Sequence, residues 1–155
     1  MINFFTILSN NFFYKKIGFC SFIILVLSSC SYNQIDINKK IDQEEGRKFV
    51  ANIYEKLMFY QDNESILAST SHGKEKLDHI LNNARVKMGT LISYDIKSVE
   101  TKSVEKNGLF KTVSYLIKIH VKYKNGESDE VFALIKQGDD KIFVNGYNIY
   151  SDLML

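Results

Sequence analysis

Proline and tryptophan are absent from this chain of 155 residues, and cysteine occurs only twice, as Cys20 and Cys30. Cys20 lies inside an apolar run and Cys30 ends it. If that run is removed before Cys30, and Cys30 is itself modified, the mature chain has no free thiol and no disulfide. Its stability then depends on an ordinary hydrophobic core, and a hydrophobic content of 45% is typical of a chain that folds.

The chain after its first 30 residues also lacks an excess of basic over acidic residues. The first 30 residues contain Lys15 and Lys16 and no acidic residue, which leaves 20 − 2 = 18 basic and 18 acidic residues in the remainder. A nucleic-acid-binding domain has a basic surplus or a basic stripe. The neutral remainder therefore excludes nucleic acid as an expected partner.

A short leader is present at the amino end. Lys15 and Lys16 precede an apolar run over 17–27, which is followed by small residues. Such a run spans roughly 16 Å as a helix, whereas crossing a bilayer takes about 20 apolar residues. A basic segment, a short apolar segment and small residues in this order predict a signal peptide over 1–29.

The end of the apolar run has a more specific pattern. Leu27-Ser28-Ser29-Cys30 resembles the bacterial lipobox, in which an aliphatic residue and two small residues precede a cysteine. The resemblance implies that the signal peptidase recognises Leu27, Ser28 and Ser29, that the chain is cut before Cys30, and that Cys30 carries palmitate-type acyl chains. Ser31 then implies sorting to the outer membrane, facing the periplasm, in a Gram-negative cell. A non-lipidated signal peptide and an uncleaved signal anchor stay open as alternatives.

The remainder divides into a short tether and one domain. Residues 30–40 are polar and lack periodicity, which predicts a lipidated cysteine with a tether, and 41–155 is long enough for a single domain. Asp42 with Glu45 three residues later predicts a capping box at the start of a helix that ends near Tyr60.

Two further helices are predicted before the chain changes its period. Asp62 or Asn63 is expected to cap a short helix. A third helix places Leu77, Ile80, Leu81, Ala84 and Met88 on one face and stops at Gly89.

From Leu91 the apolar period becomes two, which predicts strands. A bulge is expected near Lys97-Ser98, and the segment 110–123 alternates cleanly. Asn107-Gly108 and Asn125-Gly126 predict two hairpin turns, because a type I′ turn needs positive φ at both central residues.

With Asn125-Gly126 as a two-residue loop, the expected cross-strand pairs are Ile119 with Phe132, Ile117 with Leu134 and Lys122 with Asp129. A last turn at Gly138-Asp139-Asp140 leads to a fourth strand from Lys141 to about Tyr150, with a bulge or bend at Gly146.

These elements predict an α+β fold, with three N-terminal helices packed on a curved four-stranded antiparallel meander. The helix break at 60–64, the Met88-Gly89 entry into a long bent strand and the closing segment 146–151 resemble the nuclear transport factor 2-like fold. The resemblance covers about Ile41 to Asp152 and implies a cone-shaped domain. A cystatin-like fold of a helix on a sheet fits the same elements.

The sequence contains no legible catalytic or metal motif. His72 and His79 lie two helical turns apart, and His120 lies between Lys118 and Lys122, without a cysteine cluster or a His-Glu zinc motif. Asp139-Asp140 is interpreted as a solvated turn. Three tyrosines, Tyr94, Tyr115 and Tyr147, are candidates to point into a cone, although packing in the core is the simpler interpretation.

We therefore expect a non-enzymatic domain, lipid-anchored at the cell envelope, that binds an envelope protein or a small ligand and uses no cofactor. One alternative is a small isomerase or hydrolase whose site lies inside the cone. This alternative requires a deep pocket with a buried carboxylate beside one of the three tyrosines. Another is a structural or immunity-type lipoprotein that acts through an open sheet edge.

Overall fold

The structure of the chain is a computed structural model that describes residues 33–60, 63–70, 72–108, 110–138 and 141–154. The chain divides into two units, Met1–Tyr32 and Asn33–Leu155, and all described residues belong to the second unit. The predicted leader and its lipobox, Leu27-Ser28-Ser29-Cys30, lie outside the described residues. The same holds for Cys20, Asp62 and the turn residues Asp139-Asp140.

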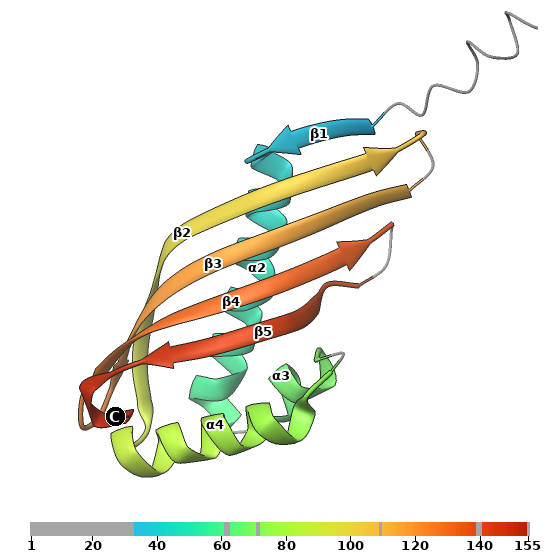
Figure 1. Cartoon of the computed structure of the whole chain (residues 1–155). Helices are drawn as coiled ribbons and strands as arrows, with labels where there is room; N and C mark the ends of the chain where they lie inside the picture. Colours follow the sequence, from blue (N-terminus) through green and yellow to red (C-terminus); the bar gives the residue numbers. More distant parts are fainter. Residues whose placement is uncertain (1–32, 61–62, 71, 109, 139–140, 155) are drawn as a thin grey trace, which may run out of the picture. The chain divides into compact units, whose positions relative to one another are not determined.

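Within the described residues, five strands form one antiparallel sheet in the order β1-β2-β3-β4-β5 (Figure 1). The strands are β1 (Asn33–Ile37), β2 (Leu91–Lys106), β3 (Phe110–Tyr123), β4 (Glu127–Gln137) and β5 (Phe143–Tyr150). Alternate residues of β3 face the core, as the sequence predicts: Val113, Tyr115, Ile117, Ile119, Val121 and Tyr123 are all buried.

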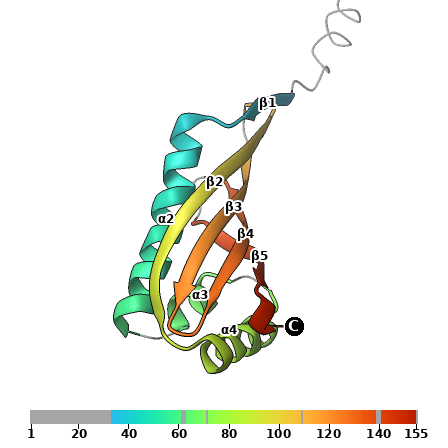
Figure 2. The same ribbon diagram turned by 90° about the vertical axis from the view of Figure 1, so that its left-hand side faces the viewer.

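The helices α2 (Lys40–Tyr60), α3 (Glu64–Ala68) and α4 (Lys74–Met88) lie between β1 and β2 in the chain. Helix α2 runs across one face of the sheet, which we call the inner face, whereas α3 and α4 lie at one end of it (Figures 1 and 2). The C-cap Gly89 has a φ of 81° and donates its N–H to Arg85 O at 2.9 Å. This confirms the predicted stop of the third helix.

The predicted fold class is wrong in its element order. The structure has a strand before the helices, and this strand pairs with β2 from Asn33–Lys106 to Ile37–Lys102. The expected four-stranded meander therefore becomes a five-stranded sheet, and β1 occupies part of the segment 30–40 that the sequence predicted to be a tether. Strand β1 was hard to recognise in the sequence because only two of its residues, Ile35 and Ile37, are apolar. An edge strand forms there because the 16-residue β2 offers a free edge next to it.

The expected capping box is also wrong. Helix α2 begins at Lys40, before the predicted cap. Asp42 lies inside the first turn, where it is buried and accepts a hydrogen bond from Lys111 Nζ at 3.0 Å. Glu45 accepts hydrogen bonds from Lys136 Nζ at 2.5 Å and from Tyr115 Oη at 2.9 Å. Both carboxylates therefore join α2 to the sheet instead of capping the helix.

The first hairpin turn has the positive φ that the sequence predicts, 55° at Asn107 and 67° at Gly108, but Lys106 pairs with Phe110, so three residues and not two separate the strands. The second turn does not. Tyr123 N donates to Gly126 O at 2.8 Å, which puts Lys124 and Asn125 at its tip. The backbone N–H groups of these two residues donate to Thr90 O and Met88 O, both at 2.9 Å, and these bonds fix the turn against the end of α4.

The register of the second hairpin is therefore shifted from the predicted one. Ile117 pairs with Phe132, Ile119 with Glu130, His120 with Asp129, and Lys122 with Glu127. The predicted faces of the strands are retained because the shift is by an even number of residues.

The two expected irregularities are confirmed. The register of β2 shifts between Ile96 and Ser98, and that of the last strand pair shifts beside Gly146. No helix in the described part of the chain is both long enough and apolar enough to cross a membrane.

Candidate functional site

A carboxylate with no solvent exposure lies in the core of the unit. Glu130, on β4, has a relative exposure of 0%. Its Oε1 accepts hydrogen bonds from Tyr123 Oη at 2.7 Å and from Ser128 Oγ at 2.8 Å. Its Oε2 accepts hydrogen bonds from the hydroxyl groups of Tyr54 and Tyr147. The four donors come from α2, β3, β4 and β5, so one side chain connects most of the fold.

Four donors match the acceptor capacity of an ionised carboxylate, which has about four lone-pair sites on its two oxygens. Burial, and after it the charge of Glu130, raise the pKa of Tyr54, Tyr123 and Tyr147. The three hydroxyl groups therefore stay protonated and act as donors. A buried charge that is satisfied in this way stabilises the arrangement of the strands and the helix around it.

This cluster answers part of what the sequence left open about the tyrosines. Tyr147 contacts a buried carboxylate, as the enzyme alternative required. Tyr115 instead donates to Glu45, and Tyr94 stacks on Tyr54 with a ring-centroid distance of 4.8 Å. Of the three predicted candidates, the structure brings only Tyr147 to the carboxylate.

Sequence reasoning did not single out Glu130, although one signal for it exists. Ser128, Glu130, Phe132 and Leu134 alternate along β4, and all four are buried. An acidic residue in phase with the core positions of a strand indicates a buried charge with partners.

The enzyme alternative also needs access to that charge, but Glu130 lines none of the four cavities described for the structure. Fully buried Phe132, Ile117 and Ile66 occupy the core with it.

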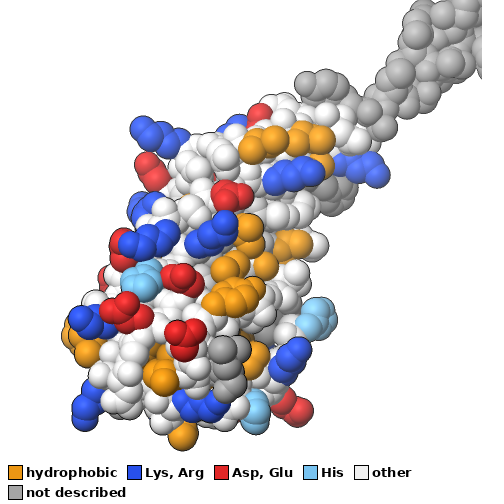
Figure 3. All heavy atoms as spheres, turned by 60° about the vertical axis from the view of Figure 1, so that its left-hand side comes forward, with side chains coloured by type: hydrophobic (Ala, Val, Ile, Leu, Met, Phe, Trp, Pro, Cys, Tyr) orange, Lys and Arg blue, Asp and Glu red, His pale blue; other side chains and the backbone are white. Residues whose placement is uncertain are grey.

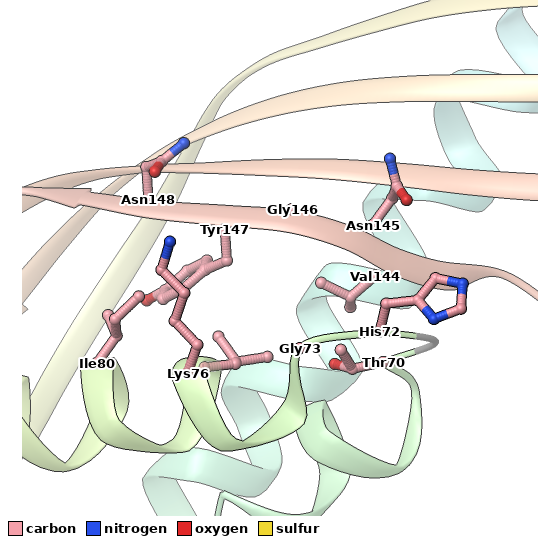
Figure 4. Close-up of a pocket in the computed structure, with 11 residues that line it drawn as sticks. Thr70, His72, Gly73, Lys76, Ile80, Val144, Asn145, Gly146, Tyr147 and Asn148 are labelled. Atoms are coloured by element: carbon pink, nitrogen blue, oxygen red, sulfur yellow. The ribbon is translucent and has the colours of Figure 1, made fainter.

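A groove of about 270 Å³ lies between α4 and β5 (Figure 4). We call it the α4–β5 groove. Its lining residues are Thr70, His72, Gly73, Lys76, Leu77, Ile80, Val144, Asn145, Gly146, Tyr147 and Asn148. Tyr147 and Val144 extend from β5 towards the helix, and Lys76 and Ile80 extend from the helix towards the strand. The groove therefore has an apolar floor and a polar rim.

Strand β5 is the last strand of the described sheet, so its outer edge lies towards this groove. Among the described residues, one backbone hydrogen bond crosses that edge, from Val144 N to Ser69 O at 2.7 Å. At the other end of the strand, the 3-10 helix η1 (Asp152–Met154) contacts α4. Between these two contacts, the segment 145–150 presents an open strand edge, which is a template for another chain.

The histidines are not brought together. His72 precedes α4 at the rim of the groove, and His79 lies on α4 with Asn83 Nδ2 at 3.3 Å from its Nδ1. His120 lies on the sheet, with Asp129 Oδ1 at 2.9 Å and Glu127 Oε2 at 3.4 Å from its ring nitrogens. Within the described ranges, no group of three or more His, Cys, Asp or Glu side chains is arranged to hold a metal ion.

The comparisons with known proteins found no relative. No family model matches the sequence, and neither the curated proteins nor the solved structures include a significant match to the chain. The resemblances to the lipobox and to the nuclear transport factor 2-like fold therefore stay predictions from the sequence.

Proposed function

We propose that this chain is a lipoprotein, anchored at Cys30, whose folded unit binds an extended polypeptide segment of an envelope partner in the α4–β5 groove. The observation that carries the binding proposal is the open edge of β5 above an apolar floor. Leu27-Ser28-Ser29-Cys30 supports the anchor. The expected address is the outer membrane, facing the periplasm, and the binding unit acts as a non-enzymatic module.

Addition of a strand to an open edge combines two kinds of interaction. Backbone hydrogen bonds supply affinity, and pockets for alternate side chains supply selectivity. The free edge over 145–150 spans roughly 20 Å at about 3.3 Å per residue. Leu77, Val144 and Tyr147 line the groove under this edge and form its apolar floor, with most of each side chain buried in the core. An extended segment of about six residues fits this length.

The rim of the groove indicates the charge of the ligand. Lys76 is exposed on α4, its side chain extends towards β5, and it has no ion pair with a described residue. An acidic side chain on the bound segment would meet this ammonium group across the groove. We therefore expect a preference for segments with an Asp or Glu between apolar residues.

Selection from a library of displayed random peptides tests this function. The acylated protein in membranes is the target, and the enriched peptides are measured against Lys76→Glu and Lys74→Glu. The two variants change the net charge equally, but Lys74 does not line the groove. We expect peptides with an acidic residue, a loss of binding of about tenfold or more in Lys76→Glu, and unchanged binding in Lys74→Glu.

Enriched peptides that bind Lys76→Glu as well as the natural protein would contradict the proposed site. The NMR signals of the backbone amides locate the contact independently. Addition of a strand to β5 must shift the amide signals of β5 and leave those of β1 unchanged. Recovery of no peptide above background would count against binding of extended segments.

The anchor has its own test. In a Cys30→Ser variant, labelled palmitate should no longer enter the protein, and the protein should no longer fractionate as a cleaved membrane lipoprotein. Ser21→Ala is a matched control inside the apolar run and should leave labelling unchanged. Continued labelling of Cys30→Ser would overturn the anchor without affecting the groove.

A further inference from the structure

Two isoleucines on β1 are exposed although they belong to a sheet. Ile35 is 56% exposed and Ile37 is 71% exposed. They pair with Val104 and Lys102 of β2, whose neighbours Thr101 and Ser103 are buried in the core. Because successive residues of a strand point to opposite faces, Ile35 and Ile37 lie on the face of the sheet opposite the core and α2. We call this face the outer face.

A further exposed apolar side chain, Leu116 of β3, lies on the same face, across the charged β2 residues Glu100 and Lys102. Ile37 and Leu116 line one surface hollow of about 290 Å³, together with Lys102 and Ser114. Leu116 is 38% exposed. We call Ile35, Ile37 and Leu116 the β1 patch. Hydrophobic side chains gather near the upper end of the face drawn in Figure 3, with lysine or arginine side chains beside them.

The patch is close along the chain to the predicted lipid attachment site. Only Ser31 and Tyr32 separate Cys30 from Asn33, the first residue of β1. Three residue steps reach at most about 10 Å. If Cys30 is acylated, its acyl chains are in the bilayer and the start of β1 is therefore held at the membrane surface. The segment that would have kept the unit clear of the lipid headgroups is largely used by β1 itself.

We propose that the β1 patch rests on the bilayer, with the outer face of the sheet at β1 turned towards the lipid. This inference rests on the proposed anchor at Cys30. Three exposed apolar side chains bind a membrane weakly alone, but a covalent anchor makes the contact intramolecular and raises the effective lipid concentration. Lys102 fits this contact because its aliphatic stem covers apolar surface while its ammonium group reaches the phosphates.

The absence of tryptophan from the chain makes a direct test available. Single tryptophans are introduced as Ile37→Trp and, for control, Ile41→Trp and Val86→Trp, and the acylated proteins are reconstituted in phosphatidylethanolamine–phosphatidylglycerol vesicles. Ile41 is 72% exposed on α2, on the other side of the sheet, and Val86 is 82% exposed on α4. The probe at Ile41 is therefore close to the anchor in sequence but on the wrong face.

We expect a blue-shifted emission of the Ile37→Trp protein and quenching by lipids brominated on their acyl chains. The emission of the Val86→Trp protein should stay that of a solvated indole, and quenching of the Ile41→Trp protein should be at least twofold weaker. Equal quenching at Ile37 and Ile41 would overturn the proposal, because proximity alone would then explain it. A blue shift of the Ile37→Trp protein without quenching by the brominated lipids would also overturn the proposal, because a second copy or another protein would then cover the patch.

Two results separate this inference from the proposed function. Labelled palmitate reports whether Cys30 is acylated, whatever the patch does. A double Ile35→Thr, Ile37→Thr variant keeps β-branched side chains in the strand and should keep its acylation and its circular dichroism spectrum. The rate at which an added protease cuts β1 is then compared between this variant and the natural protein, both in vesicles. Equal rates would show that the patch does not contact the bilayer, even though the anchor holds.

Discussion

Tyr147 donates its hydroxyl hydrogen to Oε2 of Glu130 while its ring lines the α4–β5 groove. The residue therefore belongs both to the buried cluster and to the proposed binding surface. Phe132 packs against the same ring, with a centroid distance of 4.5 Å. Movement of this ring would disturb the carboxylate of Glu130, which accepts hydrogen bonds from α2, β3 and β5. We therefore expect the floor of the groove to be rigid when a ligand binds.

The hydrogen bond to Glu130 predicts a measurable loss of stability. Tyr147→Phe removes one donor from a buried carboxylate and should lower the free energy of unfolding by about 1.5–3 kcal/mol. Tyr150→Phe is the matched control on the same strand, since Tyr150 is 60% exposed, and should change it by less than about 0.5 kcal/mol. Urea denaturation measures both. Equal midpoints for the two variants would show that the bond contributes nothing.

Alkaline pH should unfold the protein through the same cluster. Because burial and then the charge of Glu130 raise the pKa of Tyr54, Tyr123 and Tyr147 in the folded state, folding holds their protons more tightly. This stability is complete below the unfolded-state pKa of about 10 and falls as pH rises above it, by about 1.4 kcal/mol per pH unit for each tyrosine.

The tyrosinate absorbance measures this effect. The three buried tyrosines should ionise only together with loss of the circular dichroism signal, and the loss should be less steep in Tyr147→Phe. Complete ionisation of every tyrosine in a protein that stays folded would contradict the prediction.

Gly46 is predicted to be required for the contact between α2 and the sheet. A Cβ atom on Gly46 would lie 2.7 Å from Tyr115 Cδ1, inside the buried contact with β3. In Gly46→Ala, overpacking should lower the free energy of unfolding by about 1–3 kcal/mol, which should exceed the gain of about 1 kcal/mol from the better helix propensity of alanine. Gly126→Ala is the control, because its Cβ meets Leu153 Cδ1 at the same 2.7 Å but that side chain is 42% exposed and can rotate. Thermal unfolding should rank Gly46→Ala below Gly126→Ala, and the reverse order would refute the argument.

The ion pair between Lys111 and Asp42 should matter more than an exposed pair. Lys111→Met leaves a carboxylate that is 3% exposed without its cation, which should cost about 3 kcal/mol of unfolding free energy. Lys118→Met removes the exposed pair with Glu100 at 3.9 Å and should cost less than about 1 kcal/mol. Addition of Asp42→Asn to Lys111→Met should restore part of the loss. No restoration would indicate that the lysine stem, and not its charge, supplies the stability.

Elements with a strong local pattern could be predicted from the sequence, and α4 and β3 are the clearest cases. The apolar spacing and Gly89 define the end of α4, and unbroken alternation defines β3. Polar β1 could not be predicted in this way, because its hydrogen bonds come from a partner about seventy residues later in the chain. A strand of this kind depends on long-range pairing instead of on its own composition.

The second hairpin shows how a long-range contact overrides a local signal. Asn125-Gly126 favours a two-residue loop, but the carbonyls of Met88 and Thr90 are better satisfied when Lys124 and Asn125 form the tip. The candidate groove could not be predicted at all, since it needs the relative position of α4 and β5. Glu130 could be suspected from its phase in β4, whereas its three tyrosine donors lie up to 76 positions away from it in the chain.

The late pairing of β1 has a consequence for the order of folding. As the chain emerges amino end first, Asn33 cannot meet Lys106 until three helices and the whole of β2 have followed it. Closing so long a loop costs entropy before the strand gains a partner, so the first strand is completed late. Until then the edge of β2 stays unprotected, and the backbone N–H and C=O groups along it have no partner strand. Nascent chains caught at this stage should be the species most prone to aggregate.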